Sequence, residues 1–155
     1  MVKVVNSKFE CQDCGQTSLI PMLSDFQYGE ALLRSETPQW VYLNMFADKT
    51  YEELHGIIKN NFDDIFTKNN DFNSGNKIFD EICCDPDEFG KKYTDNFRPP
   101  NCLYCHSVNG LVSDYSGPNF KRIREIPDCT HVFWNDLSED EKIAAVGNAI
   151  KEILG

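Results

Sequence analysis

The pattern of apolar and polar positions predicts strands in the N-terminal part of the chain. Residues 2–10 are expected to form a short strand that leads into Cys11. Residues 30–34 and 39–46 are two more strand-like segments, and the second is rich in β-branched and aromatic residues. Because only a short Pro-containing turn separates them, they predict a β-hairpin. Residues 19–26 show no such pattern, and we expect them to be irregular.

Two other segments carry apolar residues at helical spacing. In the first, Thr50 is an expected N-cap and Glu53 follows three residues later, which is the arrangement of a capping box. Near the C-terminus, Ser138 and Glu141 repeat that arrangement. A helix with one apolar face is predicted after each box. The two faces comprise Tyr51, Leu54, Ile57 and Ile58 in the first helix, and Ile143, Val146, Ile150, Ile153 and Leu154 in the last.

Two CxxC motifs each precede the same series of features. Cys102 and Cys105 lie 91 positions after Cys11 and Cys14, respectively. Each motif is followed by a Ser-Asp-aromatic tripeptide, a pair of strand-like segments and a capping box. In the second series the strand-like segments are Lys121–Ile126 and His131–Asn135, so a second hairpin is expected there.

We therefore predict an internally duplicated α+β fold in a single compact domain, residues 1–155. Residues 1–61 and 99–155 would be two copies of one unit, each a CxxC turn (a knuckle), a hairpin and a helix that packs against the other copy. Residues 62–98 would be a partly helical insert, since they are too aromatic for a disordered linker. Short helices are predicted near 77–83 and from Asp85, where a proline takes the first helical position.

Composition and charge restrict the class of protein. The chain has 155 residues, of which 41% are hydrophobic, and no run approaches the ~20 apolar residues that a membrane helix needs. Its start has too short an apolar core for a signal peptide, so we expect a cytoplasmic protein. The net charge of −10 repels phosphate backbones, which argues against a nucleic-acid partner. The same charge is compatible with a basic protein partner.

Seven cysteines point to metal binding or redox chemistry. In a reducing compartment, paired CxxC motifs indicate one or the other. Cys11, Cys14, Cys102 and Cys105 can offer four thiolates to one tetrahedral ion, so we predict one structural zinc per chain, with iron as an alternative. A redox CxxC opens a helix that lowers the pKa of one thiol, and neither motif here opens a helical pattern.

The order of knuckle, hairpin and helix resembles the treble-clef zinc-finger family. Members of that family take two further ligands from the start of the helix, but residues 51–55 and 139–142 contain no cysteine and only one histidine. The two motifs are more similar to the knuckles of zinc-ribbon and rubredoxin-like proteins, which face each other across one metal. This resemblance covers the CxxC motifs and their immediate flanks. It implies a shared metal site and implies no particular function.

The residues around the knuckles suggest further roles. Gly15 follows Cys14, where a knuckle turn favours positive φ, and His106 stands at the equivalent place after Cys105. His106 could also donate a hydrogen bond to a metal-bound sulfur. We expect Cys83 and Cys84 to be packing residues. Cys129 is expected to pack as well, with a spare ligand for the metal as the alternative.

The sequence lacks the motifs of common enzymes. It has no HExxH, GxSxG or phosphate-binding loop, and we expect His55 and His131 to be structural. The main hypothesis is a non-enzymatic, zinc-stabilised binding protein with an acidic surface for a protein partner. The alternatives are an acidic inhibitor such as an immunity protein of a toxin, a CxxC thiol-redox or metal-dependent enzyme, and a zinc-ribbon nucleic-acid binder.

Overall fold

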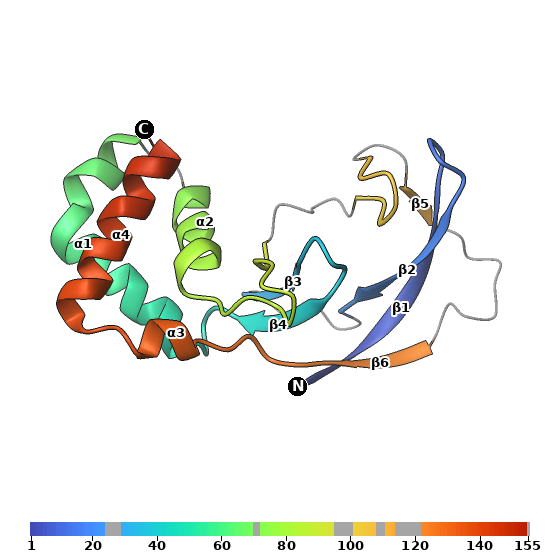
Figure 1. The fold of residues 1–155 in the computed structure, drawn as a ribbon, viewed down its shortest axis with the longest axis horizontal. Helices are drawn as coiled ribbons and strands as arrows, with labels where there is room; N and C mark the ends of the chain where they lie inside the picture. The colour runs from blue at the N-terminus through green and yellow to red at the C-terminus, as the bar shows by residue number, and fades with distance from the viewer. Residues whose placement is uncertain (24–28, 70–71, 95–100, 108–110, 114–121, 155) are drawn as a thin grey trace.

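The molecule has a strand-rich end and a helical end, with a hairpin between them (Figure 1). The computed structural model describes residues 1–23, 29–69, 72–94, 101–107, 111–113 and 122–154. In these residues it is a mixed α/β protein with small antiparallel sheets and four helices. None of the described helices has the length and apolar character that a membrane-spanning segment requires.

Strand β1 (Val2–Cys11) is the centre of a four-stranded antiparallel sheet. Strand β2 (Thr17–Met22) pairs along one of its edges. Along the other edge, β6 (Arg122–Ile126) pairs with the first half of β1, and β5 (Leu111–Ser113) pairs with its last three residues. The chain beyond the second knuckle therefore lies beside the strand that enters the first knuckle.

Strand β2 corrects the expectation that residues 19–26 are irregular, although residues 24–28 lie outside the described part of the chain. Its Ser18 and Ile20 are 3% and 4% exposed and point to the same side. Pro21 lies opposite Asn6 on β1. A proline is tolerated in β2 because this strand is at the edge of the sheet, where a missing N–H breaks no second ladder. That context is absent from the sequence pattern.

The predicted hairpin is present as β3 (Glu30–Arg34) and β4 (Trp40–Asn44), and both of its faces are buried. Alternate residues point to opposite sides of a sheet. One face, formed by Ala31, Leu33, Val41 and Leu43, contributes to the large core at the helical end. The other face, formed by Leu32, Trp40 and Tyr42, packs in a small cluster with Val4 and Ile126 of the four-stranded sheet. The hairpin thus belongs to two cores at once.

The helical end consists of α1 (Lys49–Asn69), α2 (Phe72–Ile82), α3 (Val132–Asn135) and α4 (Glu139–Leu154). Helix α4 packs against α1 and α2 (Figure 1). The predicted apolar faces of α1 and α4 enter the core, with Leu54 and Val146 completely buried. Helix α1 continues through residue 61, where we placed the end of the first unit, and is kinked at Phe62.

Only one of the two predicted capping boxes forms. At the start of α4, the Ser138 N–H donates to Glu141 Oε2 at 2.7 Å and the Glu141 N–H donates to Ser138 Oγ at 3.3 Å, as predicted. At the start of α1, the cap is Asp48, whose carboxylate accepts the backbone N–H of Thr50 at 2.8 Å. The Glu53 carboxylate does not cap the helix and instead accepts hydrogen bonds from Trp134 of α3 and Lys142 of α4.

The second hairpin is not formed, because residues 132–135 are helix α3 and not a strand. Asp85 explains the difference: its carboxylate accepts the backbone N–H groups of Val132 at 2.7 Å and Phe133 at 3.0 Å, as at a helix N-terminus. The helix predicted to begin at Asp85 is absent, and residues 85–93 are a loop. Strand β6 pairs with β1. Outside the knuckles, the structure does not show the duplication.

Candidate metal centre

The two knuckles have the same backbone geometry. In the first, the Cys11 carbonyl accepts the Gly15 N–H at 2.8 Å, and the Cys11 N–H donates to the Gln16 carbonyl at 2.9 Å. In the turn that follows Cys102, the equivalent positions make the same two hydrogen bonds, both at 3.1 Å. Two turns far apart in sequence therefore present their cysteines in the same way.

The positive φ expected after each knuckle is present. Gly15 has φ of 73° and His106 has φ of 59°. Glycine adopts this conformation without cost, whereas an L side chain is strained there. The His106 side chain is exposed, and within the described contacts it makes no hydrogen bond to a cysteine sulfur. His106 therefore shapes the turn, and its suggested hydrogen bond to sulfur is not seen.

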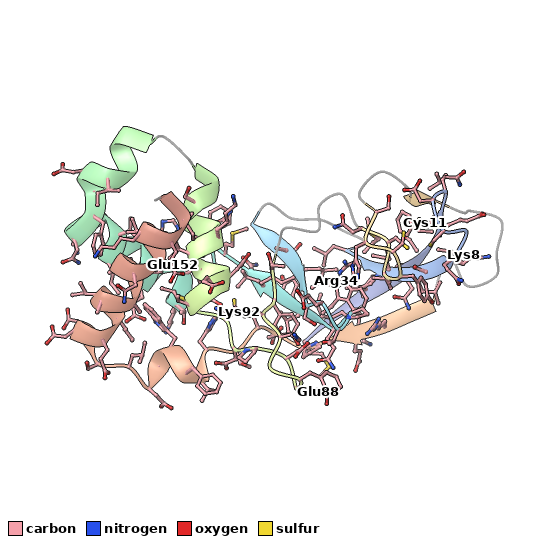
Figure 2. The ribbon with its side chains drawn as sticks, turned by 45° about the horizontal axis from the view of Figure 1, so that its top comes forward. Lys8, Cys11, Arg34, Glu88, Lys92 and Glu152 are labelled. Carbon is pink, nitrogen blue, oxygen red and sulfur yellow. The ribbon has the colours of Figure 1, made fainter. Side chains whose placement is uncertain are left out.

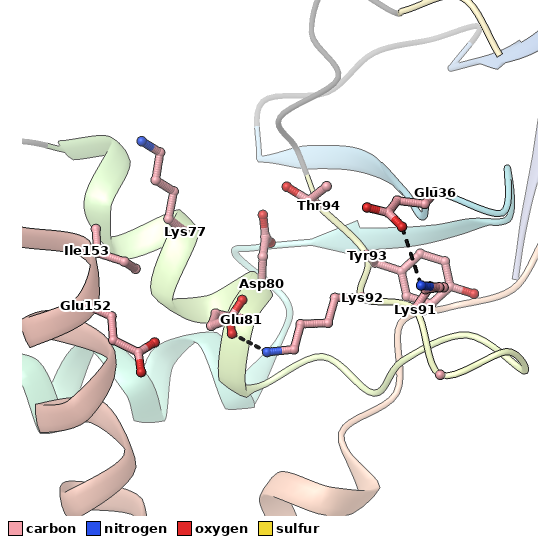
Figure 3. Close-up of a pocket in the computed structure, with 11 residues that line it drawn as sticks. Glu36, Lys77, Asp80, Glu81, Lys91, Lys92, Tyr93, Thr94, Glu152 and Ile153 are labelled. Carbon is pink, nitrogen blue, oxygen red and sulfur yellow. Dashed lines mark hydrogen bonds and ion pairs between the residues drawn. The ribbon is translucent and has the colours of Figure 1, made fainter. Parts of the chain in front are cut away.

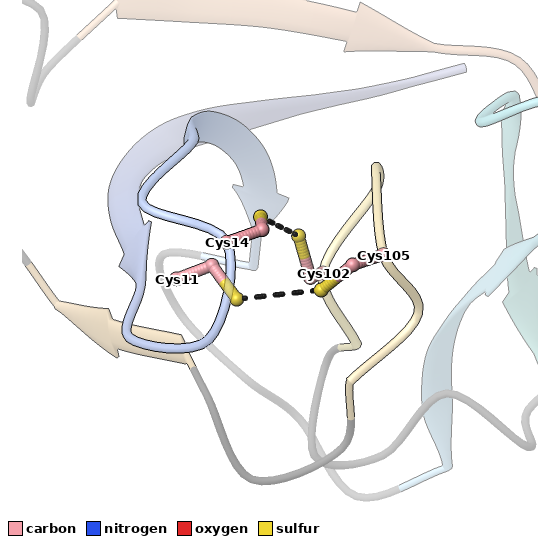
Figure 4. A group of neighbouring side chains, drawn as sticks. All are labelled: Cys11, Cys14, Cys102 and Cys105. Atoms are coloured by element: carbon pink, nitrogen blue, oxygen red, sulfur yellow. Dashed lines mark hydrogen bonds between the residues drawn. The ribbon is translucent and has the colours of Figure 1, made fainter.

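The four knuckle cysteines form one cluster (Figure 4). Cys11 Sγ lies 3.6 Å from Cys105 Sγ, and Cys14 Sγ lies 3.6 Å from Cys102 Sγ. All four sulfurs are within 4.8 Å of one another. A zinc ion with Zn–S bonds of about 2.3 Å separates its tetrahedral ligands by about 3.8 Å. The cluster has the dimensions of such a site and is compatible with a bound metal ion.

Burial differs within each knuckle. Cys11 and Cys102, the first cysteine of each motif, are 0% exposed, whereas Cys14 and Cys105 are exposed. Cys11 is also the last residue of β1, where β5 pairs with it. The cluster therefore lies at the end of the central strand of the sheet, with two of its cysteines buried and the other two exposed.

The backbone around Cys102 favours a thiolate. Burial raises the pKa of this thiol, but the backbone N–H groups of Cys105 and Tyr104 and the thiol of Cys14 act in the opposite direction and lower it to about 7. The Tyr104 N–H lies 3.4 Å from the Cys102 sulfur. A thiolate is the form that binds a metal, so these donors prepare the second knuckle for an ion.

Arg34 is a component of this region that the sequence did not indicate. It lies on the strand-rich side, as Cys11 does, whereas Glu152 lies on the helical side (Figure 2). Arg34 is 5% exposed, and its guanidinium donates to the Asn101 carbonyl at 3.0 Å, next to Cys102. Burial lowers the pKa of Arg34, and attraction to the Cys102 sulfur opposes this. Four thiolates around a divalent ion would carry a net charge of −2, and this buried cation would offset part of it.

A separate cleft of about 720 Å³ lies between α2, the end of α4 and the loop at residues 90–94 (Figure 3). It is lined by charges of both signs, which include the ion pairs of Lys91 with Glu36 and of Lys92 with Glu81. No cysteine or histidine is among the described residues that line it. The cleft is therefore not part of the metal centre.

The other three cysteines lie away from the knuckles. Cys83 and Cys84 are buried at 1% and 8% exposure, and both belong to the large core at the helical end. Cys129 is not a spare ligand of the four-cysteine cluster, because it lies next to Cys84 and His131. These three residues place two sulfurs and a ring nitrogen within 4.8 Å of one another. The spacing Cys129-x-His131 is the sequence signal for this second cluster, and His131 precedes helix α3 and does not begin the predicted strand.

Comparison of the chain with protein-family models, with curated proteins and with solved structures found no match. The chemistry of the two cysteine-containing clusters is therefore the basis for assigning a function.

Proposed function

We propose that the four-cysteine cluster binds one zinc ion and that the protein is a non-enzymatic, zinc-stabilised binding protein. The observation that carries this proposal is that four cysteine thiols converge at tetrahedral spacing. Four protein ligands complete the coordination of zinc and leave no position for water or substrate, as in structural sites. The ion then acts as a cross-link between two turns that are distant in sequence.

The test of the zinc site is elemental analysis of the purified protein and of two matched variants. Cys102→Ser should lose the zinc of this cluster and lower the melting temperature. Cys83→Ser changes an equally buried cysteine outside both clusters and should retain the zinc. Iron in place of zinc would give a coloured protein and an iron signal in the same measurement. Unchanged zinc content and melting temperature in Cys102→Ser would refute the site.

The proposed partner is a basic protein. The net charge of −10 favours association with a positively charged surface and disfavours nucleic acid. Tyr104, between the cysteines of the second knuckle, is 60% exposed, and large exposed aromatic side chains are enriched at protein interfaces. We therefore place the zinc-supported second knuckle at the contact surface.

Affinity purification from native lysate at low and at high salt tests the partner proposal. We expect a stoichiometric basic protein at low salt, with recovery reduced by Tyr104→Ala and by Cys102→Ser. The exposed Phe46, at 72% exposure and outside the knuckles, gives the matched control Phe46→Ala, which should leave recovery unchanged. Absence of a stoichiometric protein at any salt concentration would contradict the proposal.

A further inference from the structure

A second group of metal-binding side chains lies at the helical end of the molecule. Cys84 is the second residue after the end of α2, and Cys129 and His131 come from the segment between β6 and α3. Their sulfur and nitrogen atoms are within 4.8 Å of one another. Thiolate and imidazole are the ligands that zinc and related transition metals prefer, while magnesium and calcium prefer oxygen.

Backbone hydrogen bonds hold the two contributing segments together. The Asp85 N–H donates to the Thr130 carbonyl at 2.9 Å, and the Asp85 carboxylate caps α3 immediately after His131. On the other side, the Cys129 N–H donates to the Tyr42 carbonyl at 2.8 Å. The segments that carry the three side chains are thus fixed by the fold, and a metal ion does not need to bring them together.

The surroundings of His131 fit a metal ligand. Nδ1 lies 2.7 Å from the Cys83 carbonyl oxygen, and Nε2 lies 2.8 Å from Asp48 Oδ2. A metal-bound histidine needs one nitrogen for the ion and an acceptor for the N–H of the other. In the structure both ring nitrogens face an oxygen acceptor, so an ion would replace one of these two contacts, and the other nitrogen would keep the acceptor that fixes the ring. Phe79 packs against the ring with centroids 5.5 Å apart, which further restricts its rotation.

Charge balance also favours a divalent ion. Cys84 is 8% exposed and the His131 side chain is 10% exposed, so an isolated charge at this place would be costly. One divalent cation with two thiolates and a neutral imidazole has no net charge. Binding would release the two thiol protons.

We infer that Cys84, Cys129 and His131 form a second metal site, which takes a soft divalent cation such as Zn²⁺. The three side chains leave one position of a tetrahedral ion for water or another small ligand, unlike the complete set of the four-cysteine cluster. No fourth cysteine, histidine or carboxylate of the described residues joins the cluster. This site is independent of the zinc proposed at the knuckles.

The test uses Co²⁺ added to the full-length protein as purified, with its tightly held metal at the knuckles, and monitored by absorption. We expect one equivalent to bind, with a thiolate-to-cobalt charge-transfer band that corresponds to two thiolates and visible bands of a tetrahedral ion. Zn²⁺ should displace the Co²⁺ and bleach both. Absence of these bands would overturn the inference.

Three variants locate the site. Cys129→Ser, at a partly exposed position, and His131→Gln should each lose the bands, while Cys83→Ala, the more buried neighbour of Cys84, should keep them. Circular dichroism before titration establishes that each variant is folded, and Cys129→Ser is the one expected to fold most easily. Bands that survive Cys129→Ser but disappear in Cys102→Ser would assign the cobalt to the knuckles and refute the second site. A Cys102→Ser protein that has lost only the knuckle zinc should still show the cobalt bands of the second site.

Discussion

The helical end and the strand-rich end of the molecule differ in what stabilises each of them. Among the residues that the structure describes, the helical end has a core of 15 buried residues that includes Leu54, Phe79 and Trp134. In the same part of the chain, the apolar cluster between the hairpin and the four-stranded sheet contains three buried residues, Val4, Trp40 and Ile126. The four-cysteine cluster lies at the strand-rich end, where Cys11 ends β1 (Figure 2). The proposed metal cross-link would therefore support the end whose described apolar cluster is the smaller of the two, as in small domains that rely on a metal in place of a large core.

Removal of zinc is expected to have the largest effect on stability. It should destabilise the strand-rich end and leave the helical end folded. Structural zinc sites contribute roughly 10 kcal/mol or more of apparent binding energy, whereas burial of a large apolar side chain contributes about 2 kcal/mol. Chelation should abolish the hydrogen-exchange protection of β1 and leave that of α4 largely intact. Simultaneous loss of protection in both elements would show that the two ends unfold as one unit.

A large-to-small substitution in the helical core should lower stability less than zinc removal does. It should affect the helical end and leave the strand-rich end unchanged. Leu54 is 0% exposed, so Leu54→Ala should lower the free energy of unfolding by about 2–5 kcal/mol. Zinc content should not change. Ile65→Ala, on the same helix at 43% exposure, is the control and should cost well under 1 kcal/mol. Denaturant unfolding measures the free energy of unfolding, and elemental analysis measures the zinc content. Loss of zinc in Leu54→Ala would show that the metal site depends on the helical core.

Asp87 provides a pH-dependent test where the loop after α2 meets the hairpin turn. Its carboxylate accepts the backbone N–H of Phe89 at 2.9 Å and of Lys91 at 2.8 Å, and it also accepts the Thr37 hydroxyl. Burial raises its pKa, but these donors and the Ser35 hydroxyl lower it to about 2. Since the unfolded value is about 3.9, the carboxylate stabilises the fold fully above that pH and loses this contribution as pH falls through about 2.

Asp87→Asn should therefore destabilise the protein by about 1 kcal/mol near neutral pH. The difference from wild type should shrink as pH falls below about 3.9. Chemical denaturation of both proteins between neutral and acidic pH measures it. A difference in the free energy of unfolding that stays constant down to about pH 2 would show that the charge of Asp87 does not contribute to stability.

The smallest effect is expected at the second knuckle. His106→Gly removes an L side chain from a backbone with φ of 59° and should stabilise the protein by up to about 1 kcal/mol. Gly15 has φ of 73°, and no atom lies within 4 Å of a methyl group added there. Gly15→Ala should therefore destabilise the protein through the same backbone strain and without a steric clash. Thermal melting of zinc-loaded protein measures both. A loss of zinc in His106→Gly would mean that the imidazole supports the metal.

The features predicted correctly from sequence are those with a local physical cause. The CxxC spacing identified the four clustered cysteines, and the turn geometry explained Gly15 and His106. Apolar periodicity located β3, β4, α1 and α4. Ser138 and Glu141 lie three residues apart, so their capping box needed no other part of the chain.

The features that sequence missed depend on distant partners. Residues 132–135 have an aromatic, strand-like composition, yet Asp85 caps them as a helix from 47 positions away. Arg34 was assigned to a strand, but its position next to Cys102 depends on how the hairpin packs against the second knuckle. Cys84 and His131 are likewise brought together only by the tertiary fold.

The doubly buried hairpin has a consequence for dissecting the protein into fragments. A fragment without residues 1–23 and 101–126 would retain the helices but would expose Leu32, Trp40 and Tyr42, since their covering strands would be gone. Exposed apolar strands promote intermolecular association. Independent expression of the helical end would therefore require polar substitutions at these three positions, which face away from its own core.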